Sequence, residues 1–376
     1  MAAIRRMSRI DDENLTKATI ADELAGARRR TLALLEPLDE AALARQWSPI
    51  MSPLVWDLVH VGFFEELWTC RELAGDAPRR PAFDDLYDAF SHSRAERTEL
   101  PLLHGEDAFA YLAEVRERTL ELLDGVELDT DDPRFAGGYL YGLVVQHEHQ
   151  HVETMLQTLQ LSGLEIADPE PERPVCGDGA VVVEAGPFTL GADGEPWAYD
   201  NELKPSEAEL PAFRIDRFPV SNARYADYLD ATGAQPPGFW RRDGAGWART
   251  RFGREEALPP DEPVRHVSWH EADAYARWAG KRLPTEHEWE KARKAGVLEA
   301  TGSVYEWTSS DFRPYPGFRA FPYREYSEVF FGDEYRVLRG ASFAGGPVLA
   351  RPSYRNWDYP VRRQIFAGFR CAEDVE

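Results

Sequence analysis

The long run from Leu143 to Leu161 contains neither glycine nor proline, and its apolar residues recur at helical intervals. This pattern predicts one long helix. Residues four apart share a helix face, so His147 and His151 are expected to point the same way and could hold one metal ion between them. His149 is turned roughly 160–200° away from His147, at about 100° per residue, and is expected to be an ordinary histidine.

The same letters also spell H-E-x-x-H from His147 to His151. This short motif is typical of zinc proteases, in which the glutamate, here Glu148, serves as general base. A zinc hydrolase is therefore one hypothesis. Because Glu148 follows His147 directly, it faces elsewhere on the helix, which favours a role behind the metal ligands or on the surface.

The chain has 376 residues and a formal charge of −23, from 43 Lys plus Arg against 66 Asp plus Glu. Such a length predicts two domains, or three. The negative charge opposes nonspecific binding to nucleic acid or to an anionic membrane, since both would be repelled. Small molecules are the expected partners. We expect a monomer, although the sequence does not fix the oligomeric state.

Three cysteines, Cys70, Cys176 and Cys371, are far apart and odd in number. They make neither a disulfide framework nor a thiolate zinc site, which indicates a reducing cytoplasm. The basic segment Met1 to Arg9 is followed by acidic residues, and about 18 consecutive apolar residues occur nowhere. We therefore expect neither a signal peptide nor a membrane span.

The N-terminal half predicts a four-helix bundle, and bundle cores are common places for metal sites. The helices are expected at residues 13–36, at 52–68 with Ser52 as N-cap and Pro53 in the first turn, at about 106–123, and at 143–161 after Gly137-Gly138. His60 lies in the middle of the second helix.

The composition changes at residues 164–175, where prolines alternate with acids, and this predicts a linker. Beyond it we expect strands at 181–183, 188–190 and 213–215 and short helices at 222–232 and 271–278 among long loops. The predicted domains are thus an all-α bundle at 11–163, a linker at 164–176 and an irregular α+β domain at 177–376. We find no internal repeat and no phosphate-binding glycine loop.

Several motifs of the second half occur in a fixed order: Val183-Glu184-Ala185-Gly186-Pro187-Phe188, Pro219-Val220-Ser221-Asn222, Pro263 to Trp269, Lys281 to Glu290, Gly302-Ser303-Val304-Tyr305-Glu306-Trp307, Leu338-Arg339-Gly340 and Gly368-Phe369-Arg370. With them this half resembles the formylglycine-generating-enzyme (sulfatase-modifying factor) fold, a C-type-lectin-like α+β architecture. The N-terminal half resembles a DinB-like four-helix domain.

Fused in this order, the two halves resemble the sulfoxide synthases of ergothioneine biosynthesis, which are non-haem iron enzymes. Residues 52–72, 87–103 and 146–159 resemble the actinobacterial branch. The resemblance implies Fe(2+) held by His60, His147 and His151, and an O2-dependent reaction. In that reaction the imidazole C2 of hercynine is joined to the sulfur of γ-glutamylcysteine, or of cysteine, with oxygenation of the sulfur.

The resemblance also implies substrate-binding residues. Arg94 and Arg97 would otherwise be taken as solvated surface residues in a loop of mixed charge. By the resemblance they hold the carboxylates of the thiol substrate, and guanidinium groups suit that task. The segment Asn356-Trp357-Asp358, with Gln150 from the metal helix, would bind the betaine of hercynine, where an aromatic face and a carboxylate suit a quaternary ammonium.

A tyrosine of the second domain is implied as proton donor, which favours sulfoxide formation over simple thiol oxidation. Tyr323 is the first choice and Tyr326 the second. Two departures stand out. Formylglycine-generating enzymes use a cysteine pair with copper, whereas only Cys371 lies near that position, and Ser303 replaces an asparagine, which puts a structural calcium in doubt.

Three alternatives remain beside this hypothesis. A zinc hydrolase would contain zinc and depend on Glu148. A selenoneine synthase would use a selenosugar in place of the thiol, and Arg94 with Arg97 disfavours it. A non-catalytic binding module would hold no metal.

Overall fold

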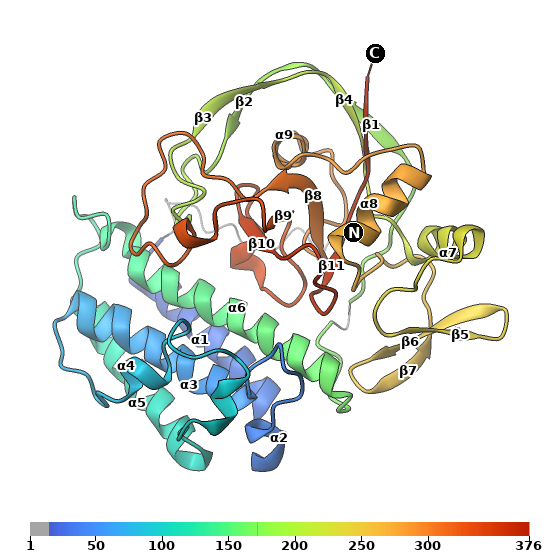
Figure 1. Ribbon diagram of the computed structural model, residues 1–376. Coiled ribbons are helices and arrows are strands. Elements are labelled where there is room, and N and C mark those ends of the chain that lie inside the picture. The colour runs from blue at the N-terminus through green and yellow to red at the C-terminus, as the bar shows by residue number, and fades with distance from the viewer. Residues whose placement is uncertain (1–14, 171, 376) are drawn as a thin grey trace. The chain divides into compact units, whose positions relative to one another are not determined.

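The computed structural model describes residues 15–170 and 172–375 (Figure 1). The chain divides into two compact units, the first ending at Ser162 and the second beginning at Gly163. The predicted helix start at residue 13 and the predicted domain start at residue 11 lie outside the described residues. The predicted fold class, an all-helical domain followed by an α+β domain, is confirmed.

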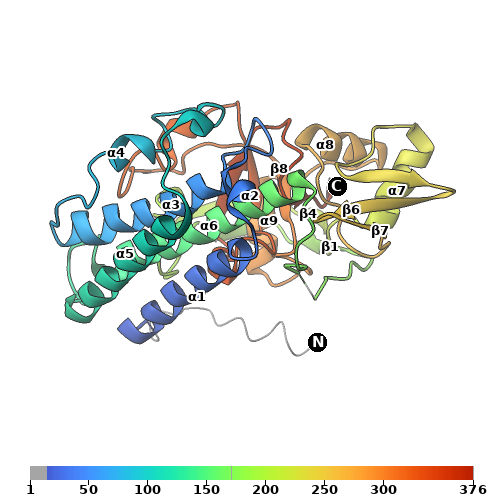
Figure 2. The ribbon, with the colours of Figure 1, turned by 90° about the horizontal axis from the view of Figure 1, so that it is seen from below.

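Four long helices form the first unit: α1 (Lys17–Leu35), α3 (Leu54–Glu65), α5 (Gly105–Gly125) and α6 (Tyr139–Ser162). Shorter elements connect them, namely α2 (Glu40–Ala44), the π-helix η3 (Glu66–Leu73), α4 (Phe83–Leu86) and the 3₁₀ turns η4 (Glu96–Glu99) and η5 (Ala136–Gly138). Helix α1 packs on α5 and α6, and α3 also packs on α5 and α6, which closes a ring of four helices (Figure 2). This is the predicted bundle.

Local chemistry explains where two of these helices begin. Thr16 and Thr19 form a reciprocal capping box at the start of α1. Before α6 the chain turns through Gly137 and Gly138, both with positive φ. Gly138 has φ +67°, and a Cβ there would lie 2.6 Å from Cδ1 of Ile20 on α1, so both the backbone and the close approach favour glycine where α6 starts beside α1.

The second helix departs from its prediction at both ends. Ser52 is not its N-cap, because Pro53 holds that position without a side-chain bond. The Ser52 hydroxyl instead accepts a hydrogen bond of 2.7 Å from Nη1 of Arg97. Beyond Glu65 the chain continues past the predicted end at residue 68 as the π-helix η3.

The second unit is built from small sheets and short helices. Its strands are β1 (Ala180–Val183), β2 (Gly186–Leu190), β3 (Ser206–Leu210), β4 (Phe213–Asp216), β5 (Trp240–Asp243), β6 (Gly246–Arg251), β7 (Arg254–Ala257), β8 (Tyr305–Asp311), β9 (Arg336–Arg339), β10 (Arg355–Asp358), β11 (Ala367–Gly368) and β12 (Ala372–Asp374). They pair in the orders β1-β4-β12, β10-β9-β8-β11, β2-β3 and β5-β6-β7, mostly antiparallel, with β11 parallel to β8.

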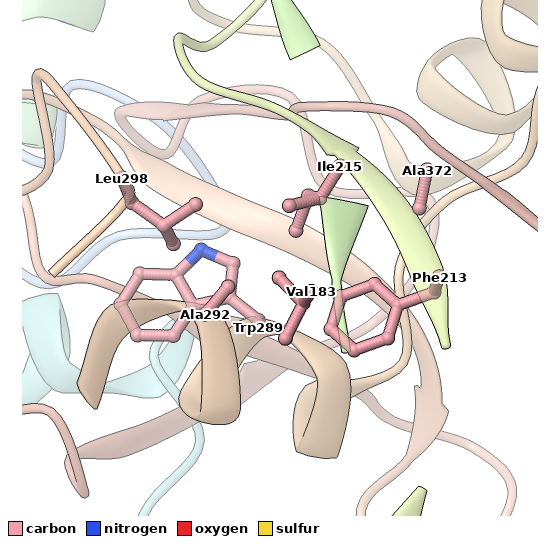
Figure 3. Packing of buried hydrophobic residues seen from close by; sticks show 7 residues of the cluster. All are labelled: Val183, Phe213, Ile215, Trp289, Ala292, Leu298 and Ala372. Atoms are coloured by element: carbon pink, nitrogen blue, oxygen red, sulfur yellow. The ribbon is translucent and has the colours of Figure 1, made fainter. Parts of the chain in front are cut away.

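The helices of this unit are α7 (Asn222–Thr232), α8 (Trp269–Trp278) and α9 (Glu286–Lys294), and the 3₁₀ turns are η6 (Glu328–Phe330) and η7 (Pro347–Leu349). Helix α9 was not predicted, although Thr285 and Glu288 form a capping box at its start. Trp289 of α9 is fully buried and packs against the sheet β1-β4-β12, as Figure 3 shows for Phe213 and Ile215. This cluster is a core of the second unit.

The segment 164–176, predicted as a linker, belongs to the second unit, and ion pairs fix its described residues there. Arg265 holds the buried carboxylate of Glu170 with two bonds of 2.6 and 2.8 Å, and Arg251 reaches Asp168 at 2.9 Å. The turn between β6 and β7 also packs closely against this segment. A Cβ at Gly253 would lie only 2.6 Å from the backbone nitrogen of Glu165.

Among the described residues no helix is both apolar and long enough for a membrane crossing. Cys70, Cys176 and Cys371 are free thiols, and all are buried. The expectation that they form no disulfide framework agrees with this arrangement.

We predict that Gly253→Ala costs about 2–4 kcal/mol of folding free energy. The residue has φ +76°, a region that costs alanine about 1–2 kcal/mol, and its methyl group would overlap the backbone of residues 163–165. Gly244→Ala is the matched control, because Gly244 has φ +58° in the neighbouring turn of the same sheet with nothing within 4 Å of a Cβ. Calorimetric unfolding of both variants measures the difference, and equal losses would contradict the close approach.

Candidate metal centre

Three imidazoles meet in the first unit. His60 comes from α3, and His147 and His151 come from successive turns of α6; in the described part of the chain they form the group suited to a metal ion, with one ring nitrogen of each within 4.8 Å of the others. Nε2 of His60 lies 3.2 Å from Nε2 of His147. His60 is buried, whereas the two rings on α6 are half-buried.

Hydrogen bonds at the outer nitrogens fix how two of the rings point. Nδ1 of His60 donates to the carbonyl oxygen of Tyr87 at 2.7 Å, and Nδ1 of His151 lies 2.9 Å from Oδ1 of Asp57. A histidine whose Nδ1 donates in this way keeps its lone pair on Nε2. The sequence reasoning missed Asp57, although its position one helical turn before His60 was a usable signal.

Aromatic side chains stack on two of the three histidines. Trp56 stacks on His60 with ring centroids 4.5 Å apart and an interplanar angle of 13°. Phe64 stacks on His147 at 3.6 Å and 10°. These contacts restrict rotation of the imidazoles, so their ring nitrogens are held near one another before any ligand binds.

The electrostatics favour neutral imidazoles. Burial, followed by the proximity of His151, lowers the pKa of both His60 and His147 well below 6.5. Neutral imidazole is the form that binds a metal. Nε2 of His60 and Nε2 of His147 converge to 3.2 Å, and one oxygen of Asp57 is buried without a hydrogen-bond partner. A bound cation fits this arrangement.

Glu148 takes no part in the histidine group. It is fully buried, so its predicted alternative as a surface residue is wrong. Its carboxylate is held by Arg28 at 2.8 Å and by Arg116 at 2.9 Å. A carboxylate held by two guanidinium groups is a poor general base, which disfavours the zinc hydrolase. His149 is also buried, and its Nδ1 lies 2.9 Å from Nη1 of Arg30.

The two predicted substrate arginines differ in their surroundings. Arg94 is exposed and donates to the carbonyl oxygen of Ile50 at 2.6 Å. Arg97 is buried, contrary to the surface position expected from its charged loop, and its guanidinium lies 3.5 Å above the ring of Trp56. Burial lowers the pKa of Arg97 to about 10, partly offset by the charge of Asp57.

Gln150, the other substrate residue predicted in this unit, is half-buried on α6, one residue before His151. The structure thus places it next to the histidine group along the same helix. Its role with the substrate stays a prediction.

In the second unit the two candidate tyrosines lie in the loop between β8 and β9. Tyr323 and Tyr326 have ring centroids 6.3 Å apart, and Tyr326 meets Trp357 of β10 edge-on at 5.8 Å. Tyr326 also stacks on Tyr199 at 4.0 Å. Burial, and then the charge of Asp200, raises the pKa of Tyr323, so its hydroxyl keeps its proton at neutral pH.

The strand β10 separates the members of the predicted hercynine-binding segment. Side chains alternate along a strand, so Trp357 lies on one face while Asn356 and Asp358 lie on the other. Trp357 stacks on Phe312 at 4.0 Å, on the same face as the preceding Arg355. Tyr326 and Trp357 therefore form one group, from which Asn356 and Asp358 are turned away.

Comparison with known proteins agrees with these two units. Residues 23–155 match the DinB superfamily, and residues 166–301 and 293–375 match the sulfatase-modifying factor enzyme 1-like domain. The chain is 44% identical to the hercynine oxygenase of Mycolicibacterium smegmatis, covering 96% of this chain and 100% of that protein. It is 42% identical to the hercynine oxygenase of Mycobacterium tuberculosis, covering 95% of this chain and 99% of that protein.

Fold and site together define a two-domain, metal-dependent oxygenase, in which a DinB-type bundle precedes a sulfatase-modifying-factor domain. The chain belongs to the hercynine oxygenase family. It is also 36% identical to the formylglycine-generating enzyme of Streptomyces coelicolor, but over only 38% of this chain and 54% of that protein. The family resemblance noted from the sequence motifs is thereby confirmed.

We predict that Asp57→Asn weakens metal binding about 10–100-fold, because an amide no longer fixes the ring of His151 with a negative charge. Anaerobic titration with cobalt(II), followed by its visible absorption, measures the affinity. Asp84→Asn is the control, since the Asp84 carboxylate pairs with Arg71 elsewhere in the unit. An unchanged cobalt affinity in Asp57→Asn would contradict the orienting role.

Proposed function

We propose that the protein is an iron(II)-dependent oxygenase of ergothioneine biosynthesis that acts on hercynine. In the proposed reaction the C2–H bond of hercynine and the S–H bond of γ-glutamylcysteine, or of cysteine, are broken and a C–S bond forms. One oxygen atom of O2 is added to the sulfur, and the other leaves as water with the two hydrogens. The observation that carries this proposal is the meeting of His60, His147 and His151 in a chain 44% identical over nearly its whole length to a hercynine oxygenase.

The three histidines would hold the iron through ring nitrogens. Neutral imidazoles suit first-row metals, and three of them leave coordination positions for other ligands. Bound there, iron(II) would supply the redox chemistry with O2 and a position for the thiolate of the substrate. Asp57 and Tyr87 keep the rings of His151 and His60 oriented through their Nδ1 contacts.

Other residues would bind the two organic substrates. Arg94 and Arg97 would hold the carboxylates of the thiol compound, for which planar guanidinium forks are suited. Arg97 has donors already engaged by Ser52 and Ala89, so the exposed Arg94 offers the freer fork. Trp357 would face the trimethylammonium group of hercynine through its π surface.

Gln150, Asn356 and Asp358 would complete the hercynine site. Since Asn356 and Asp358 lie on the face of β10 opposite to Trp357, these residues would contact different parts of the betaine or of its surroundings. Asp358 accepts a hydrogen bond of 2.7 Å from the backbone of Tyr359.

Tyr323 would be the proton donor, with Tyr326 as the second candidate. A raised pKa keeps the Tyr323 hydroxyl protonated at neutral pH, which a general acid requires. Tyr326 is packed between Tyr199 and Trp357, an arrangement that favours a positioning role for this ring. The free, buried thiols of the chain support a reducing, cytoplasmic location.

Anaerobic reconstitution with iron(II), followed by exposure to O2 with hercynine and one donor at a time, tests the function. We predict that mass analysis finds a hercynine-derived sulfoxide with γ-glutamylcysteine or cysteine. A product only with a selenosugar would instead identify a selenoneine synthase. No hercynine-derived product with any donor would refute the assignment.

A second prediction concerns the ligand set. His60→Ala should lose bound iron, because one of three imidazoles is removed from the group. Iron content after anaerobic loading and desalting measures the loss. His270→Ala, at an exposed histidine of α8, is the control and should retain iron. Undiminished iron in His60→Ala would exclude His60 as a ligand.

A further inference from the structure

Four charged side chains, one from each long helix of the bundle, meet in its interior. We call them the charge quartet: Arg28 of α1, Glu65 of α3, Arg116 of α5 and Glu148 of α6. Both carboxylates are fully buried, and each arginine is 8% exposed. With two positive and two negative groups, the quartet has no net charge.

Each arginine bridges the two carboxylates. Arg28 donates from Nη2 to Glu65 and from Nε to Glu148, at 2.8 Å in both cases. Arg116 donates from Nε to Glu65 at 2.6 Å and from Nη2 to Glu148 at 2.9 Å. The hydroxyl of Thr31 adds a bond of 2.9 Å to Glu148. The planar forks thus fix α3 and α6 in direction as well as in distance.

The arginines are also tied to the backbone of the helices on which they do not lie. Arg28 of α1 donates to the carbonyl oxygen of Leu112 on α5 at 3.0 Å, and Arg116 of α5 donates to the carbonyl oxygen of Leu24 on α1. The quartet therefore connects all four helices of the ring.

Such a network contributes little net stability. Desolvation of buried charges offsets most of their attraction, and apolar side chains of similar volume often replace a buried ion pair without loss. What directional ion pairs can add is one fixed register between helices, because a shifted register leaves charges unpaired.

The register in question is that of the two helices that carry the histidines. Glu148 directly follows His147 on α6, and Glu65 lies five residues after His60 on α3, about 7.5 Å along the helix axis. Helix α3 ends at Glu65, where its hydrogen bonding changes to that of the π-helix η3. Two unscreened carboxylates would push α3 and α6 apart, and the arginines prevent this.

We infer that the charge quartet sets the register of α3 against α6 and thereby the metal affinity of the three histidines. Arg28 and Arg116 are positioning residues for that site, although they lie on the two helices that supply none of its histidines. The inference rests on the proposed ligand set, and it assigns Glu148 of the H-E-x-x-H motif a structural charge in place of a general base.

The test separates folding stability from metal binding. The double variant Arg28→Leu/Glu148→Leu removes one positive and one negative group and leaves Arg116 paired with Glu65. We expect its metal-free protein to melt within a few degrees of wild type and its cobalt(II) affinity to fall at least about tenfold. The absorption spectrum of bound cobalt should also change, since it reports ligand geometry.

Two further variants separate the effect of the arginine fork from a general defect of the bundle. Arg28→Lys retains the charge but loses the fork, so it should fold normally and bind cobalt more weakly than wild type, even if the double variant fails to fold. Thr119→Val is the matched control. It removes the buried hydrogen bond of 2.8 Å between Thr119 of α5 and Thr69 of η3, which does not involve α6, and it should leave cobalt affinity unchanged.

Wild-type cobalt affinity and spectrum in the folded double variant, or in Arg28→Lys, overturn the positioning role while the proposed function stands. Equal losses of affinity in the threonine control overturn it as well, because any bundle defect would then have the same effect. Wild-type protein that binds no cobalt overturns both the proposed function and this inference.

Discussion

The first unit depends on one close approach, the 3.2 Å between Nε2 of His60 and Nε2 of His147. Two lone pairs at this distance repel each other in the absence of a proton or a cation. Burial opposes a positive charge on either ring, since it lowers the pKa of both, and the Nδ1 bonds of His60 to Tyr87 and of His151 to Asp57 turn Nε2 of these two rings toward the group. The bundle thus holds three ring nitrogens close enough to share one metal ion.

In the second unit, buried ion pairs fix the strand that carries Trp357. The strands and helices of this unit are short, and Arg355 ties β10 to α9 through bonds of 2.8 and 3.0 Å to the carboxylate of Glu286. Arg339 of the neighbouring strand β9 holds Glu290 of α9 at 2.6 Å, and all four groups are buried. The two guanidinium groups thus fix α9 against the paired strands β9 and β10. Trp357 is carried by the strand fixed in this way.

Periodicity predicted what depends on neighbours along the chain: the four long helices, several strands and the shared face of the two α6 histidines. Contacts between distant residues could not be predicted in this way. Ser52 satisfies the N-cap pattern but is used by Arg97 from another segment, and a charged loop gave no sign that Arg97 is buried over an aromatic ring. The spacing of Asp57 and His60 places both on one face of α3, but the bond of Asp57 to His151 depends on how α3 packs on α6. Trp357 was grouped with its neighbours in sequence, whereas strand geometry separates them.

The H-E-x-x-H letters illustrate how surroundings decide chemistry. On any helix the two histidines of this motif share a face and the glutamate lies about 100° aside. Whether that glutamate can accept a proton depends on the groups opposite it. Here Arg28 and Arg116 hold its carboxylate in the charged form, and burial excludes the water it would need to activate. The histidines keep their capacity for metal, while the hydrolytic partner is converted into part of the helix framework. A third imidazole from α3 then completes a set of neutral ligands suited to redox chemistry.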